Sequence, residues 1–158
     1  MADVIGTASN STASFVTKEY PVANGVTVTD GDVVYWASGR VTNATIAGAT
    51  VLGVVQGGQS ADMSNVANSN GSPVAATGNS AGTVTVLVIV DPSVKVLFSQ
   101  NAAPTVGGRY NLSGSTGAQT VNVSGGAGTQ VECIAVSYKN NTSVGVYIFN
   151  KHEYKVSA

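Results

Sequence analysis

The chain has 158 residues, of which 43% are hydrophobic and only 9% are charged. Soluble domains usually carry about 25% charged residues, and here Ser, Thr, Asn and Gly take the place of the missing charges. Seven basic and eight acidic residues exclude the clustered Lys and Arg of a nucleic-acid-binding surface. We expect one globular domain whose easily desolvated polar surface is covered by partner subunits; a small neutral secreted domain is the alternative.

The cysteine content and the apolar runs indicate the cellular compartment in which the protein is made. Cys133 is the only cysteine, so we expect no intrachain disulfide and no cysteine-based zinc site. Residues 1–6 do not combine a basic segment with an apolar run, so no signal peptide is expected. The longest apolar stretch, Val84 to Val90, is too short for a membrane helix. These features predict synthesis in a reducing cytoplasm and no membrane partner.

Residues 1–19 are rich in Ser, Thr, Ala and Asn and show no sustained periodicity. They predict an extended N-terminal arm whose main apolar anchors are Phe15 and Val16, and a disordered terminus is the alternative. The folded domain is then expected to occupy residues 20–158.

Strand signals dominate the rest of the chain. Val26 to Thr29 alternates β-branched residues and is followed by the tight-turn dipeptide Asp30-Gly31. Val33 to Trp36 then predicts a returning strand. Adjacent strand residues point to opposite faces, so Tyr35 and Trp36 cannot form one aromatic platform. We expect Trp36 to anchor the core.

Further β-branched runs, separated by Gly, Ser and Asn, predict strands at 41–46, 51–55, 83–90, 94–98, 109–112, 120–123, 131–138 and 144–149. The last two form the clearest hairpin, in which Cys133 and Ala135 share a face of small residues suited to close packing. No segment carries a helical stripe of useful length. The pattern predicts an all-β fold, a single β-sandwich or β-barrel domain with an extended N-terminal arm.

The span 57–82 is rich in Gly, Ser and Asn and contains no clear strand pattern. Loops of this length in compact domains are usually functional or disordered, so we expect a surface loop that meets a partner. Met63 and Val66 lie three residues apart within it and would share a face of a single helical turn.

Candidate catalytic and ligand-binding groups are few. His152 is the only histidine and lies among charged residues near the C-terminus, where we expect it to be solvated rather than held beside a nucleophile. Asp30 and Asp32 form the one close carboxylate pair. Their spacing would offer two ligands to Ca²⁺, but turn chemistry explains them better because the further oxygen ligands are missing. We therefore expect no enzyme, no catalytic residue, no metal and no cofactor.

Three stretches together suggest a family. The first runs from Val26 to Gly57 and contains Asp-Gly-Asp-Val-Val at 30–34 and Ala-Gly-Ala-Thr-Val-Leu-Gly-Val-Val at 47–55; the second is Val-Gly-Gly-Arg-Tyr-Asn-Leu at 106–112; the third is the hairpin at 133–148. This order resembles the capsid decoration, or cement, proteins of tailed bacteriophages. The resemblance implies a small β-rich protein on the outside of the shell that staples neighbouring capsid subunits, often as a trimer.

The resemblance also implies a location and a set of partners. We expect the major capsid protein and further copies of this chain, as a homotrimer, to be the partners, and the capsid outer surface of the virion to be the location after synthesis in the host cytoplasm. Expected partner contacts are Phe15, Val16, Tyr20, Met63 and Val66.

Two other functions remain open. A receptor- or sugar-binding module of a fibre or adhesin would be favoured by an exposed Trp36 or a row of tyrosines. A trimeric β-barrel hydrolase would need a carboxylate cluster that the sequence does not contain.

Overall fold

The computed structural model describes residues 3–4, 17–43, 50–60, 75–90, 94–115, 117–124, 133–138 and 143–149. These residues form β-strands and turns, which confirms the prediction of an all-β fold. In the described part of the chain, no helix has the length and apolar character needed to cross a membrane. The strands in chain order are β1 (Asp3–Val4), β2 (Thr17–Pro21), β3 (Thr27–Thr29), β4 (Val33–Ala37), β5 (Arg40–Thr42), β6 (Thr50–Ser60), β7 (Ala75–Thr77), β8 (Val84–Ile89), β9 (Val96–Ser99), β10 (Arg109–Ser113), β11 (Thr120–Asn122), β12 (Cys133–Tyr138) and β13 (Val144–Ile148).

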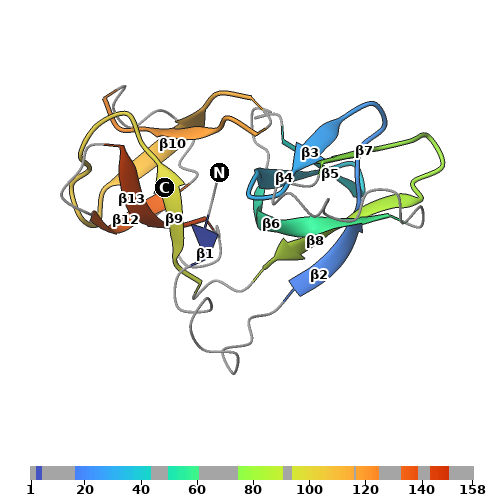
Figure 1. Ribbon diagram of the computed structural model, residues 1–158, viewed down its shortest axis with the longest axis horizontal. Coiled ribbons are helices and arrows are strands. Elements are labelled where there is room, and N and C mark those ends of the chain that lie inside the picture. Colours follow the sequence, from blue (N-terminus) through green and yellow to red (C-terminus); the bar gives the residue numbers. More distant parts are fainter. Residues whose placement is uncertain are drawn as a thin grey trace, which may run out of the picture.

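The first half of the chain forms a small barrel, which we call barrel 1 (Figure 1). Its strands are antiparallel neighbours in the order β2-β8-β6-β4-β5. The sheet curls until its two ends meet, because Val22 and Val41 form a parallel bridge. The backbone N–H of Ala23 donates to the carbonyl of Val41 at 2.9 Å. Closure leaves this sheet without a long open edge at that side.

Barrel 1 has its own apolar interior. The ribbon of β3 and β7 packs on it and contributes Val28 and Ala76. Alternation along each strand sends every second side chain inward, and the β-branched residues predicted from the sequence supply most of them. The other buried members of this cluster are Val22, Val34, Val41, Val55, Val86 and Val88.

The second half of the chain forms barrel 2 from strands in the order β9-β13-β12-β10-β11. Its closure is the same as that of barrel 1. Gln100 and Val121 form a parallel bridge, and the N–H of Asn101 donates to the carbonyl of Val121 at 3.1 Å. The short strand β1 pairs with β9 at the outer side of this sheet. The predicted hairpin of 131–138 with 144–149 is confirmed by the antiparallel pairing of β12 and β13.

The two barrels repeat one topology down to individual backbone hydrogen bonds. Gly31 N–H donates to the carbonyl of Val55 at 2.9 Å, and Gly107 N–H donates to that of Ala135 at 2.8 Å. Both glycines have a positive φ, of 89° and 80°, at the same place in the turn before a five-residue strand. The register therefore matches β4 with β10 residue by residue, so that Trp36 corresponds to Leu112.

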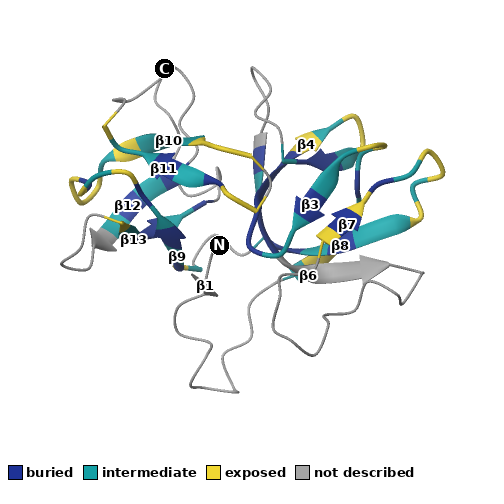
Figure 2. Cartoon of the chain, turned by 45° about the horizontal axis from the view of Figure 1, so that its top comes forward, coloured by how far each residue is buried: buried dark blue, intermediate teal, exposed yellow. Residues whose placement is uncertain are grey.

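The barrels share a second hydrophobic cluster, so they pack against each other. Barrel 2 contributes its inward-facing residues, among them Phe98, Tyr147 and Phe149. Barrel 1 contributes residues from the outward face of β4 and β6. These are Val33, Tyr35, Val51 and Val54. Figure 2 shows buried residues on strands of both barrels. The strand β4 is buried on both faces, because Val34 belongs to the cluster inside barrel 1 while Val33 and Tyr35 belong to the shared cluster.

Three sequence expectations about strands need correction. The strands on either side of Asp30-Gly31 do not form a hairpin, because β3 pairs with β7 while β4 pairs with β5 and β6. The expected loop at 57–82 begins and ends with regular structure, since β6 extends to Ser60 and β7 occupies Ala75–Thr77. Barrel 1 starts within the expected arm, because β2 begins at Thr17. Local sequence patterns did not reveal these three features, because β2, β3 and β6 are each held by pairing with a strand far along the chain.

Candidate functional site

Of the five expected partner contacts, the structure describes one. Tyr20 lies in β2, whereas Phe15, Val16, Met63 and Val66 lie outside the described residues, as does His152. The partner role of these residues stays a prediction. Tyr20 nevertheless marks a distinctive surface, because its ring lies beside Trp36.

Tyr20 and Trp36 form an aromatic pair in which Tyr20 is half-buried and Trp36 is exposed. Their ring centroids are 5.5 Å apart and their planes meet at 74°, an edge-to-face arrangement. Tyr20 lies opposite Val86 and Trp36 lies opposite Val41, so both rings are on the inner face of barrel 1. Trp36 is still 42% exposed. The pair therefore lies at the margin of the barrel interior, with the indole reaching solvent.

The prediction that Trp36 anchors the core is wrong. Its neighbour Tyr35 occupies the buried position instead, at 1% exposure. The reason is the second barrel, which covers the outward face of β4 and with it Tyr35. Trp36 points to the other face, near the end of β4 and just before the Ser38-Gly39 turn. The position near a strand end was the one sequence signal for this exposure.

Charge is sparse around the aromatic pair. Lys18 precedes Tyr20 by two residues and shares its face of β2, opposite Val88, and its side chain is exposed. We call Lys18, Tyr20 and Trp36 the aromatic rim. Glu19 points to the other face of β2, where its carboxylate accepts a hydrogen bond from the hydroxyl of Thr85. The aromatic rim thus combines two rings with one ammonium group.

The carboxylate of Asp32 has a structural role, because it accepts hydrogen bonds from two backbone N–H groups. Asp32 is 2% exposed, and its Oδ2 accepts from the N–H of Thr29 at 2.9 Å while its Oδ1 accepts from the N–H of Gly117 at 2.8 Å. Asp32 N–H in turn donates to the Thr29 carbonyl at 2.9 Å. This is the turn chemistry expected for Asp30-Gly31-Asp32. In the described part of the chain, no three His, Cys, Asp or Glu residues gather as metal ligands would.

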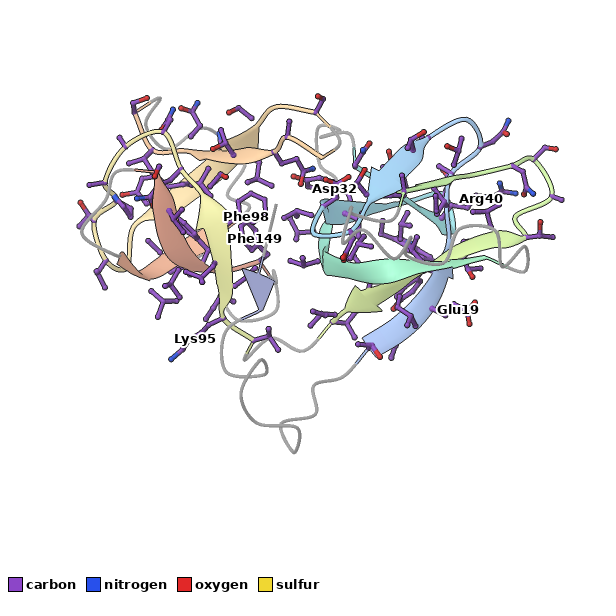
Figure 3. All side chains as sticks on the ribbon, viewed as in Figure 1. Glu19, Asp32, Arg40, Lys95, Phe98 and Phe149 are labelled. Carbon is purple, nitrogen blue, oxygen red and sulfur yellow. The ribbon has the colours of Figure 1, made fainter. Side chains whose placement is uncertain are left out.

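The bond from Gly117 to Asp32 is one polar contact between the barrels, and Gln119 forms a second. It lies in the connection between β10 and β11, which is longer than the two-residue turn between β4 and β5. Its Oε1 accepts from the N–H of Val33 at 2.7 Å, and its Nε2 donates to the carbonyls of Val33 at 3.1 Å and Asn43 at 3.4 Å. Asp32 and Gln119 together form what we call the interbarrel latch. Asp32 lies on the side of barrel 1 that faces barrel 2 (Figure 3).

The buried hydroxyl of Tyr147 also has a hydrogen-bond partner. Tyr147 donates to Oε1 of Gln100 at 2.6 Å inside barrel 2. Burial raises the pKa of Tyr147 well above its usual value, and the neighbouring Cys133 and Tyr110 add to the effect. Gly145 leaves room for the pair, since a Cβ there would meet Gln100 Oε1 at 2.1 Å. Gln100 and Tyr147 occupy the positions that Val22 and Val88 hold in barrel 1. The hydrogen-bonded pair is therefore part of the interior of barrel 2.

The buried polar side chains described here all have hydrogen-bond partners. Those of Asp32, Gln100 and Gln119 stabilise turns, a barrel interior and the contact between barrels. Comparison of the chain with family models, curated proteins and solved structures finds no match. Among the described residues, the exposed large hydrophobic side chains are Trp36 and Val106, and of these only Trp36 belongs to an aromatic pair.

Proposed function

We propose that this protein binds the outside of a tailed-bacteriophage capsid and staples neighbouring capsid subunits. The observation that carries the proposal is the Tyr20–Trp36 pair at the margin of barrel 1, in which the Trp36 indole is exposed. Large aromatic side chains dominate the energetics of protein interfaces. The resemblance of the sequence to decoration proteins supplies the identity of the partner, the major capsid protein.

The binding free energy that this surface can contribute is moderate. A tryptophan side chain offers roughly 250 Å², so the 42% of Trp36 that is exposed amounts to about 100 Å². Burying that area contributes about 2.5 kcal/mol. One such contact gives weak binding, but a homotrimer would present three. Linked contacts of this kind raise the overall affinity far above that of one site.

The low charge of the chain supports the same function. With 9% charged residues, most of the surface can be desolvated without stripping water from ions, which is the large penalty in burying a surface. A protein that binds only the assembled shell stabilises it by mass action.

Co-sedimentation of the purified protein with DNA-filled and with immature capsids of the encoding virus tests the proposal. We expect saturable binding at a fixed copy number per shell. Absence of binding to both kinds of shell would overturn it. Sedimentation equilibrium of the free protein tests the trimer separately, and a monomer at all concentrations would contradict that part.

The contribution of the N-terminal segment needs a variant that spares barrel 1. Thr17, Lys18 and Glu19 pair with β8, so a deletion of residues 1–19 would damage the barrel. Deletion of residues 1–16 removes Phe15 and Val16 and leaves β2 complete. It also removes the two-residue strand β1 from the outer side of barrel 2, so thermal unfolding must show that the shortened protein keeps its stability. We expect the shortened protein to fold and to bind shells less tightly. Equal binding would remove the segment from the interface.

The exposure of Trp36 also favours a second function, a sugar- or receptor-binding module. Sugars stack on flat aromatic faces, and the 74° angle between the Tyr20 and Trp36 planes prevents the two rings from forming one platform. This geometry makes the sugar-binding function the weaker candidate. Trp36 is the only tryptophan, so its fluorescence reports on this surface alone. Saturable quenching by oligosaccharides, combined with no binding to shells, would establish the second function over the first.

A further inference from the structure

The repeated topology shows what covers the corresponding surface in barrel 2. Counting along the matched strands, Phe98 corresponds to Tyr20 and Phe149 corresponds to Val90. Phe98 and Phe149 pack against each other with centroids 4.7 Å apart, and both are buried. They lie on the side of barrel 2 that faces barrel 1 (Figure 3). We call these corresponding positions the mouth of each barrel.

The mouth of barrel 2 is closed by a β-sheet face. The same hydrophobic cluster that contains Phe98 and Phe149 contains four residues from two adjacent strands of barrel 1. They come from the outward face of β4 and β6 and combine β-branched and aromatic side chains. These four residues are Val33, Tyr35, Val51 and Val54.

The mouth of barrel 1 is not closed in this way. Tyr20 and Val90 are only half-buried where their counterparts are buried, and Trp36 is 42% exposed. Lys18 stands at the position of the buried Val96 of barrel 2 and is exposed. Among the described residues, a face from the other barrel covers the mouth of barrel 2, whereas no such face covers the mouth of barrel 1.

We propose that the mouth of barrel 1 receives an apolar face of β-strands from the capsid subunit, as the mouth of barrel 2 receives β4 and β6. This inference rests on the proposed function and specifies which surface of the chain meets the shell. Lys18 at the margin adds a requirement for a carboxylate or carbonyl oxygen on the partner, since a buried ammonium group must be paired.

The matched β4–β6 and β10–β12 faces described for this chain do not supply such a face from a second copy. The outward residues of barrel 1 are already buried in the cluster shared with barrel 2. The matching outward positions of barrel 2 include Arg109, Asn111 and Ile134, so packing them into a second mouth would bury a guanidinium group. A head-to-tail chain of copies is therefore disfavoured by charge.

The test compares shell binding of full-length variants. Trp36→Ala removes the exposed indole, and the affinity of each single site for the shell is expected to fall on the order of 50-fold. The apparent affinity of a trimer with three linked sites is expected to fall further. Val106→Ala is the matched control, because Val106 is 58% exposed but lies in a turn of barrel 2. Thermal unfolding of both variants checks that each is folded. Unchanged affinity of Trp36→Ala with intact wild-type binding would overturn the inference and leave the proposed function standing.

A photo-crosslinking residue at position 36 identifies the occupant directly. We expect crosslinks to a β-strand of the capsid subunit in decorated shells. Crosslinks to a second copy of this chain, or to a capsid loop without strand structure, would overturn the inference. If the wild-type protein fails to bind shells at all, the proposed function fails, and this inference fails with it.

Discussion

Replacing Gln119 with alanine should weaken the contact between the two barrels. The side chain is 5% exposed and satisfies both backbone groups of Val33, accepting at 2.7 Å and donating at 3.1 Å. Alanine leaves the Val33 N–H and carbonyl without these partners. Each unsatisfied buried group costs about 1–3 kcal/mol. Because water will reach part of the vacated space, we expect a loss of about 2–4 kcal/mol of unfolding free energy.

Urea unfolding followed by far-UV circular dichroism measures this loss. With a slope of about 2 kcal/mol per molar urea, the midpoint should fall by about 1–2 M at unchanged slope. Gln119→Met separates hydrogen bonding from volume, since methionine fills similar space without these polar groups, and it should be destabilised nearly as much as Gln119→Ala. Ser115→Ala in the same connection is the control and should stay within about 0.5 kcal/mol of wild type.

The reasoning would be refuted by a small effect. A loss below about 0.5 kcal/mol in Gln119→Ala would mean that the Val33 peptide does not depend on this side chain. Full recovery of stability in Gln119→Met would assign the effect to packing instead. A changed slope would indicate that the barrels unfold separately once the contact is removed.

Two further predictions concern the barrel interiors. Tyr147→Phe removes a hydroxyl 2.6 Å from its glutamine acceptor and should cost about 1–2 kcal/mol at pH 8. Because burial raises the pKa of Tyr147, the unfolded phenol ionises first, so wild-type stability declines as pH rises above about 10. The gap between wild type and variant should therefore narrow at pH 11, and a constant gap in urea midpoints would contradict this. Gly53→Ala would place a Cβ 1.9 Å from a backbone carbonyl oxygen of β8 and should cost about 3 kcal/mol. Gly25→Ala, which has a positive φ but open space around it, should cost only about 1 kcal/mol in the same urea-unfolding assay.

The two barrels reach the same topology with different interiors. Barrel 1 closes around valines, whereas barrel 2 holds a hydrogen-bonded Tyr147–Gln100 pair in place of two of them. The shared features are the backbone bonds of Gly31 and Gly107 and the parallel bridges that close each sheet. The fold is thus set by turn geometry and strand register, and it tolerates different side chains as long as the enclosed volume is filled.

The sequence by itself determined the class of the fold and several local elements. Alternating β-branched residues predicted the strands, and Asp30-Gly31 predicted a turn, which Gly31 adopts with a φ of 89°. The face shared by Cys133 and Ala135 was predicted to pack closely, and both residues are buried. These features depend on neighbours within a few residues, because turn chemistry and the two-residue period of a strand are local properties.

Apart from the hairpin of β12 and β13, only the tertiary structure decided which strands pair. It also decided the repeat and the exposure of Trp36. The repeat is difficult to see in the sequence because matched positions differ in character, as Val33 and Arg109 do. Periodicity places Tyr35 and Trp36 on opposite faces of one strand, but it does not say which face another part of the chain will cover. Barrel 2 covers the face of Tyr35, whereas Trp36 lies on the other face near the end of β4 and is exposed, where we expect the shell to bind.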